Sequence, residues 1–244
     1  MAKMLEVQGV TKKFGGLVAI NDLSFHLEEG EVLGLMGPNG SGKTTIFNII
    51  MGDFPPDSGK IIFDGKDITN YPTYKRVKMG IARTYQVPRP IKDLPIIEDI
   101  RVSTIPDSIM GSFRGREAEH AEEIRRIAED VGLGGRLSMY PYELTMGDLR
   151  RVELAKALAT NPKLVLLDEI FAGLTVAEID EINKLLRRKR EEEGLDFVVV
   201  SHDLKALASL VDRVVVVHFG NFIAQGPFDK IVDHEEVKKA YFGY

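Results

Sequence analysis

The sequence predicts an α/β fold that has a mostly parallel sheet, an antiparallel β-layer near the N-terminus and an inserted α-helical subdomain. Three observations support this prediction. Continuous apolar runs, which are typical of buried parallel strands, alternate with amphipathic helical patterns. Short segments of alternating hydrophobicity precede the first run, and a long middle stretch contains no strand pattern. The four apolar runs are VLGLM (32–36), LVLLDE (164–169), DFVVVS (196–201) and RVVVVHFG (213–220).

The segments near the N-terminus indicate the antiparallel layer. LEVQGV (5–10) and LSFHLEEGE (23–31) alternate apolar and polar residues, as short strands do. IIFDGKDI (61–68) has a similar pattern around a turn at Asp64–Gly65. We therefore expect these segments to form short strands of an antiparallel β-layer.

Helical patterns connect the apolar runs. In residues 44–52, Ile46, Ile49 and Ile50 fall on one face of a helix. Residues 178–190 repeat apolar positions in the same way and place a charged, solvated face opposite them. Strands that alternate with helices in this manner indicate an α/β core.

The middle of the chain has a different pattern. Residues 87–95, VPRPIKDLP, contain three prolines and cannot form a regular helix. Helical periodicity follows in residues 117–133 and 149–159, and no strand run occurs between about 96 and 160. We interpret this stretch as a helical insertion that the chain enters through a proline-rich loop. The predicted organisation is a core of residues 1–90 and 160–244, a helical subdomain of residues 91–159, and a C-terminal tail of about 228–244.

Composition disfavours several classes of protein. The chain has 244 residues, of which 44% are hydrophobic, which is enough for one large domain with a full core. The formal net charge of −5 argues against nucleic acid as a partner, because nucleic-acid-binding surfaces are usually basic. Cysteine is absent, so there is no disulfide framework. The first residues contain no apolar signal region and no run has the length of a membrane span, so we expect a soluble, cytoplasmic protein.

Directly after the first apolar run, residues 37–45 read GPNGSGKTT, which fits the phosphate-loop pattern G-x-x-x-x-G-K-[ST]. Glycines allow consecutive backbone N–H groups to approach an anion, and the following helix directs its positive end to the same place. Lys43 would contact the β- and γ-phosphates, and Thr44 would offer its hydroxyl to Mg²⁺. The alternative, a glycine-rich turn without a ligand, is disfavoured because a strand precedes the pattern and a helix follows it. The sequence thus predicts a P-loop NTPase (RecA-like) core, with a loop made of Gly37, Pro38, Asn39, Gly40, Ser41, Gly42, Lys43, Thr44 and Thr45.

LVLLDE supplies further candidate residues at the end of a predicted strand. Asp168 and Glu169 follow four apolar residues, and ligands of open α/β sheets bind at this carboxyl edge. Asp168 would support Mg²⁺, and Glu169 would orient the attacking water or accept its proton. Taken alone, an acidic strand end that faces solvent would be an equal alternative. The phosphate loop in the same chain favours the site.

Two more predicted strand ends carry candidate residues. The run FVVVSH ends in His202, at the same edge as Asp168, so we favour a γ-phosphate contact over a structural histidine. Gln86 ends the short run IARTYQ just before the proline-rich loop. Gln86 could contact the metal or the water, and the local sequence leaves this role and a structural one equally open.

In order and spacing, these elements resemble the ATP-binding subunits of ABC transporters. Phe14, the phosphate loop, Gln86, a signature segment at 144–148, LVLLDE and His202 follow one another as in that family, over nearly the whole chain. Within the family, FGGLVAINDLSF, IARTYQ, DEIFAGL and the tail IAQGPFDKIVDHEEVKKAYFG are similar to the ATPases of branched-chain amino-acid importers. The lipopolysaccharide-export ATPase is also similar.

The resemblance implies an ATPase that binds ATP and Mg²⁺. Phe14 would stack on adenine, with packing in the core as the alternative. Such ATPases work as head-to-tail dimers, so Thr145 and Gly147 of the signature would contact the ATP of the other subunit. The implied catalytic residues are Lys43, Gln86, Glu169 and His202, and the implied Mg²⁺ ligands are Thr44, Gln86 and Asp168.

The resemblance also implies partners and a location. The helical insertion would abut a membrane permease at the inner face of the cell membrane, and the second ATPase subunit would be another copy or a related chain. The implied function is solute transport, with amino-acid import of the branched-chain type as the leading reading. The alternatives are a lipid- or lipopolysaccharide-type export ATPase and a regulatory module that binds ATP with low turnover.

The signature departs from the family's Leu-Ser-Gly-Gly-Gln. Residues 144–148 read LTMGD, in which Thr145 keeps a hydroxyl and Gly147 keeps a backbone N–H that can approach phosphate. The carboxylate of Asp148 would repel a triphosphate unless it points away or pairs with Arg150 or Arg151. Thr175 stands where the family usually has an aspartate. These departures lead to the hypothesis of a heterodimer with a related ATPase, in which the site formed by this signature is the weaker one.

Overall fold

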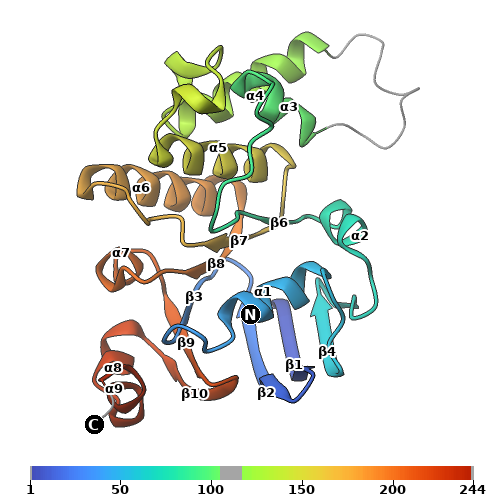
Figure 1. Cartoon of the computed structure of the whole chain (residues 1–244), viewed down its shortest axis with the longest axis vertical. Helices are drawn as coiled ribbons and strands as arrows, with labels where there is room; N and C mark the ends of the chain where they lie inside the picture. The colour runs from blue at the N-terminus through green and yellow to red at the C-terminus, as the bar shows by residue number, and fades with distance from the viewer. Residues whose placement is uncertain (1, 105–116, 243–244) are drawn as a thin grey trace.

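The computed structural model describes residues 2–104 and 117–242. Within these residues an antiparallel sheet has the strand order β2-β1-β4-β5, and a second, six-stranded sheet has the order β10-β9-β3-β8-β7-β6. Figure 1 shows the antiparallel strands at one end of the molecule and helices α3, α4 and α5 at the other. The arrangement confirms the predicted α/β fold with a mostly parallel sheet and an N-terminal antiparallel layer.

The antiparallel sheet contains longer strands than the sequence predicts. β1 and β2 each have 12 residues, because shifts in register, one of them between Val7 and Val10, let the pairing continue through interruptions of the alternation. Asp64 and Gly65 have φ angles of 49° and 70°, which is the left-handed turn that an Asp-Gly pair favours. The strands are β1 (Lys3–Phe14), β2 (Leu17–Glu28), β4 (Ser58–Phe63) and β5 (Lys66–Asp67).

The six-stranded sheet contains the predicted apolar runs. β9, β3, β8, β7 and β6 are parallel to their neighbours, and β10 returns antiparallel to β9. All residues of β3, β7 and β8 are buried, which accounts for their continuous apolar composition. β10 is not among the predicted strands, because NFIAQG is largely exposed and contains no apolar run. The strands are β3 (Val32–Met36), β6 (Ile81–Arg83), β7 (Leu164–Asp168), β8 (Asp196–Val200), β9 (Arg213–His218) and β10 (Asn221–Gly226).

Alternate residues of this sheet pack into two different hydrophobic cores. Leu33 and Leu35 of β3 pack with helix α1 and the antiparallel sheet, whereas Val32 and Met36 pack with α5 and α6. Because both faces of the six-stranded sheet are covered, a ligand site is expected at the carboxyl ends of its strands. The helices outside the middle segment are α1 (Lys43–Met51), α2 (Thr73–Lys78), α6 (Val176–Glu193), α7 (Leu204–Ala208), α8 (Phe228–Val232) and α9 (Glu235–Phe242).

A helical segment connects β6 to β7. Residues 87–95 contain no helix, as their prolines predict, and no strand occurs among the described residues between 96 and 160. The elements of this segment are α3 (Ile96–Val102), α4 (Glu117–Asp130), the 3-10 turns η1 (Gly134–Arg136) and η2 (Pro141–Glu143), and α5 (Met146–Ala159).

Of the predicted C-terminal tail, residues 243 and 244 lie outside the described residues. Within the ranges 2–104 and 117–242, we find no helix with both the length and the apolar character needed to span a membrane.

Candidate active site

A cleft of about 340 Å³ lies beside the phosphate loop, where β7 and β8 end. Gly37 and Pro38 begin the loop but do not line this cleft. Leu17, Val18, Ala19, Val200 and Phe219 line it without having been predicted. The predicted residues that line the cleft are Phe14, Asn39, Gly40, Ser41, Gly42, Lys43, Thr44, Thr45, Gln86, Asp168, Glu169 and His202.

Two glycines of the loop occupy positions that no other residue can fill. Gly37 has a φ of 153°, and a Cβ atom there would lie 2.1 Å from the carbonyl oxygen of Val217. Gly42 has a φ of 106°, and a Cβ there would lie 2.8 Å from the carbonyl oxygen of Ala19. Gly42 is also the N-cap of α1, so the positive end of this helix lies at the loop, where it favours an anion.

Lys43 is folded into the loop. Its Nζ atom donates hydrogen bonds to the carbonyl oxygens of Gly37 at 2.6 Å and Pro38 at 2.9 Å. Burial lowers the pKa of Lys43, while the charges of Glu169 and Asp168 act in the opposite direction. The loop therefore encloses a partly desolvated cation, which attracts a phosphate anion strongly.

Asp168 ends β7 and is held by an arginine that the sequence reasoning missed. Its Oδ2 atom accepts a hydrogen bond of 2.9 Å from Nη2 of Arg83, and both side chains are buried. Arg83 also donates to Asn48 of α1, so one guanidinium joins β6, β7 and the helix that follows the phosphate loop. A lone arginine within the apolar run IARTYQ is the signal that could have revealed this role, because a buried charge needs a partner.

Glu169 has a strained backbone and a partly unsatisfied carboxylate. Its φ angle is 54°, which is rare for a residue other than glycine and often marks a functional site. Oε2 accepts a hydrogen bond of 3.1 Å from the backbone N–H of His202. Oε1 is buried without a hydrogen-bond partner, although Nε2 of His202 lies 3.3 Å away, within ion-pair distance if the imidazole is protonated.

The environment of Glu169 favours proton transfer. Burial raises the pKa of Glu169, and the backbone N–H of His202 opposes this shift. A carboxylate with a raised pKa is a better proton acceptor, and its unpaired oxygen can accept a hydrogen bond from a water molecule. This geometry suits an attacking water.

Three other predicted residues, Phe14, Thr44 and Gln86, line the same cleft as Asp168 and Glu169. Thr44 and Gln86 are exposed and line the cleft. Phe14 is 47% exposed and packs edge-on against Phe54, with ring centroids 5.3 Å apart. Because Phe14 is not part of the core, its ring is accessible to a base, and its stacking on adenine stays a prediction.

The signature residues lie elsewhere. Thr145 and Gly147 do not line the cleft but stand at the start of α5, where Thr145 is the N-cap. Asp148 accepts hydrogen bonds from the backbone N–H and the hydroxyl of Thr145, and its own N–H donates to that hydroxyl. This capping box directs the Asp148 carboxylate into the helix end.

Neither Arg150 nor Arg151, the two candidate partners of Asp148, pairs with it. Asp148 pairs with Arg136 of η1, whereas Arg150 donates to the Glu169 carbonyl and Arg151 to the Val131 carbonyl. The charge of Asp148 is therefore compensated within the helical segment by a residue 12 positions away. Asp148 therefore places no unpaired negative charge at the start of α5.

Thr175 likewise has a local structural role. It is the N-cap of α6 and forms a capping box with Glu178, whose Oε2 atom accepts bonds of 2.8 Å from both the N–H and the hydroxyl of Thr175. Thr175 therefore stabilises the start of a long helix.

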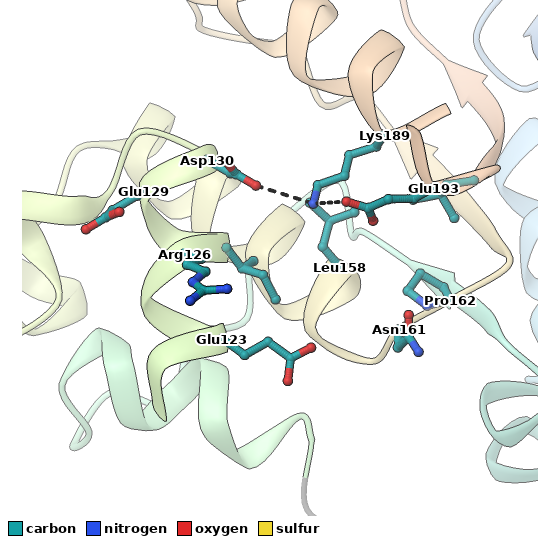
Figure 2. A pocket seen from close by; sticks show the side chains of 11 residues that line it. Glu123, Arg126, Glu129, Asp130, Leu158, Asn161, Pro162, Lys189 and Glu193 are labelled. Carbon is teal, nitrogen blue, oxygen red and sulfur yellow. Dashed lines mark hydrogen bonds and ion pairs between the residues drawn. The ribbon is translucent and has the colours of Figure 1, made fainter. Parts of the chain in front are cut away.

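A second cleft of about 510 Å³ lies between α4, α5 and α6, away from the phosphate loop. Figure 2 shows Lys189 of α6 reaching toward Asp130 of α4 and Glu193 of its own helix, at 3.3 and 2.6 Å. Lys189 thus pairs with two carboxylates that line this cleft, and the cleft contains none of the predicted site residues.

Together, the loop, the buried lysine and the acidic strand end define a nucleotide-binding protein of the P-loop class. A family model described as ABC transporter matches residues 20–172. The chain belongs to the ABC transporter family, whose ATP-binding domains are ATPases.

Known relatives match the chain along its whole length. It is 34% identical to the high-affinity branched-chain amino acid transport ATP-binding protein BraF of Pseudomonas aeruginosa, over 98% of both chains. It is 33% identical to the probable branched-chain amino acid transport ATP-binding protein LivG of Archaeoglobus fulgidus, over 99% of this chain and 96% of the relative.

Solved structures show the same fold. A nucleotide-free ATP-binding cassette from an ABC transporter superimposes with a TM-score of 0.89 at 28% identity, and all of both chains is covered. A dimeric ATP-binding cassette bound to ADP and inorganic phosphate gives a TM-score of 0.79 at 27% identity, over 92% of this chain and 99% of the other. The fold is thus one that binds nucleotide.

Proposed function

We propose that this chain is the ATP-hydrolysing subunit of an importer for branched-chain amino acids. The observation that carries the proposal is the similarity, over nearly the whole chain, to ATP-binding proteins named for branched-chain amino acid transport. The cleft supports it, because Lys43, Asp168, Glu169 and His202 meet there. Solute specificity would lie in the partner proteins.

ATP is bound with its phosphates in the loop 37–45 and its base against Phe14. Mg²⁺ would be held by the oxygen atoms of Thr44, Asp168 and Gln86, a donor set that this ion prefers. Phosphate oxygens and water would supply the remaining ligands, because Mg²⁺ usually keeps several waters when it binds with a nucleotide. When bound, Mg²⁺ neutralises charge on the β- and γ-phosphates.

Hydrolysis depends on the carboxylate of Glu169. Its buried oxygen without a hydrogen-bond partner orients the water that attacks the γ-phosphate, and the carboxylate accepts the proton of that water. Lys43 contacts the transferred phosphoryl group, and His202 does so from the neighbouring strand end. The strained backbone of Glu169 fixes its position, since its N–H donates to the Val200 carbonyl at 2.9 Å.

The active form is a dimer on the cytoplasmic side of a membrane permease. Thr145 and Gly147 of one subunit would complete the ATP site of the other, which agrees with their absence from the cleft of their own chain. The second subunit is a copy of this chain or a related ATPase. Because Asp148 and Thr175 cap helices, neither residue prevents a homodimer.

The test is Glu169→Gln, with Glu192→Gln on the exposed surface of α6 as the control. We expect Glu169→Gln to lose ATP hydrolysis, to keep ATP affinity and to trap an ATP-bound dimer in sedimentation experiments. Mixing tagged and untagged copies then distinguishes a homodimer from a chain that needs a related partner. Equal, slow hydrolysis by wild type and Glu169→Gln would instead support a regulatory ATP-binding module.

The transport direction is tested after co-purification with the permease. We expect ATP-dependent uptake of a branched-chain amino acid into reconstituted vesicles. Extraction of lipid or lipopolysaccharide from the membrane, without uptake, would overturn import in favour of export.

A further inference from the structure

The C-terminal helices pack against the edge of the six-stranded sheet that leads to the phosphate loop. Figure 1 shows α8 and α9 beside β9 and β10. Ile231 and Val237 anchor these helices, each with only 4% of its surface exposed. Tyr241, in the last turn of α9, is partly buried against the same core.

Tyr241 contacts the first residue of the phosphate loop. Its hydroxyl oxygen accepts a hydrogen bond of 2.8 Å from the backbone N–H of Gly37, across 204 residues of sequence. The carbonyl oxygen of Gly37 accepts the bond of 2.6 Å from Lys43. The two polar groups of one residue are thus held by the C-terminal helix and by the lysine that would contact ATP.

Gly37 has no room to move toward the sheet. On one side, the carbonyl oxygen of Val217 on β9 lies so close to the Gly37 backbone that a Cβ atom would not fit between them. Tyr241 closes the N–H side. The backbone at the start of the loop is therefore fixed between β9 and α9, and Lys43 takes its position from that backbone.

The Tyr241 hydroxyl is also close enough to Glu169 to be influenced by its charge. Burial raises the pKa of Tyr241, and the negative charge of Glu169 adds to this effect. The hydroxyl therefore stays protonated and can act as the neutral acceptor of the Gly37 N–H.

We propose that Tyr241 is a positioning residue of the ATP site, through which docking of α9 sets the backbone of Gly37 and the ammonium group of Lys43. The inference rests on the proposed role of residues 37–45 as the phosphate-binding loop. In this proposal the C-terminal tail contributes to nucleotide binding, because displacement of α9 would break the hydrogen bond that holds the backbone of Gly37 at the start of the phosphate loop.

The test is Tyr241→Phe, which removes the hydroxyl and keeps the ring. Tyr74→Phe on α2 is the matched control, because Tyr74 is 57% exposed and does not line the cleft. We expect Tyr241→Phe to bind ATP about 3- to 10-fold more weakly in calorimetric titrations, the range for the net loss of one hydrogen bond. Steady-state kinetics should show a higher KM with kcat within about 2-fold, the pattern of a lost binding interaction.

Hydrogen exchange gives a direct readout of the contact. We expect the Gly37 amide to be protected in the nucleotide-free wild type and to exchange faster in Tyr241→Phe, with no change in Tyr74→Phe. The unfolding midpoint of nucleotide-free Tyr241→Phe should fall by no more than about 4 °C, as expected for a weak perturbation of a chain of this size.

The possible failures are distinguishable. Equal ATP affinity in wild type and Tyr241→Phe would overturn the role of Tyr241 alone. A larger fall in the unfolding midpoint, with kcat and KM affected together, would make Tyr241 a purely structural residue and would also overturn it. A wild-type chain that binds no ATP, or a Lys43→Ala variant that binds ATP as tightly as wild type, would overturn the proposed function itself.

Discussion

Replacement of Arg83 by methionine tests its buried ion pair with the carboxylate of Asp168. Arg83→Met keeps a long, flexible side chain but removes the guanidinium that donates to Asp168 at 2.9 Å and to Asn48. The side chains of Arg83 and Asp168 are 3% and 2% exposed, so solvent screens their ion pair very little. The variant therefore leaves a buried carboxylate without its counter-charge.

The expected cost follows from this burial. Breaking a buried pair by removing one partner costs about 3–5 kcal/mol, a large part of a typical free energy of unfolding of about 5–15 kcal/mol. Urea unfolding followed by circular dichroism measures the change. The control is Arg188→Met, whose pair with Asp130 is 46% and 26% exposed and should contribute no more than about 1 kcal/mol.

A second substitution separates charge pairing from packing. If the cost comes from the unpaired carboxylate, adding Asp168→Asn to Arg83→Met should recover part of the lost stability. A loss below about 1 kcal/mol in Arg83→Met would refute the reasoning, since breaking a buried pair costs several times more. The same conclusion would follow if Asp168→Asn destabilised the variant as much as it destabilises the wild type.

Two other substitutions test the steric fit of the phosphate loop and the protonation of Asp196, the first residue of β8. Gly42→Ala should weaken ATP binding by about tenfold or more, because the new Cβ would lie 2.8 Å from the backbone oxygen of Ala19. Gly40→Ala shares the positive φ, but no atom lies within 4 Å of its new Cβ, so it should have a smaller effect; equal effects of the two substitutions in titrations would contradict the steric explanation. Burial raises the pKa of Asp196 to about 6 from 3.8, so the folded state retains a proton that the unfolded state releases between these values. The contribution of Asp196 to stability is therefore highest below about pH 4 and falls, by about 2–3 kcal/mol, as the pH rises to about 6. Asp196→Asn should remove this dependence in urea unfolding at several pH values, whereas the exposed Asp180→Asn should keep it; an unchanged pH dependence in Asp196→Asn would show that another group is responsible.

Patterns of neighbouring residues were enough to predict much of the fold. The apolar runs at β3, β7, β8 and β9 are strands because buried parallel strands need apolar side chains on both faces. The phosphate loop was predictable for a similar reason, since its glycines, lysine and threonine act through backbone geometry within a few residues. Asp168, Glu169 and His202 could be placed at one edge because parallel strands end together, and they line one cleft.

The tertiary structure alone decided which distant side chains meet. Arg83 pairs with Asp168 across 85 residues, and Tyr241 meets Gly37 across 204. Asp148 pairs with Arg136. Arg150, two positions after Asp148 on the helix, points in another direction, and the guanidinium of Arg151, three positions after it, donates to the Val131 carbonyl. The sequence by itself therefore determined the strands and the phosphate loop, which depend on local geometry. Only the folded chain decided the partners of Asp168, Asp148 and Gly37, because hydrogen bonds between distant segments depend on where the whole chain places them.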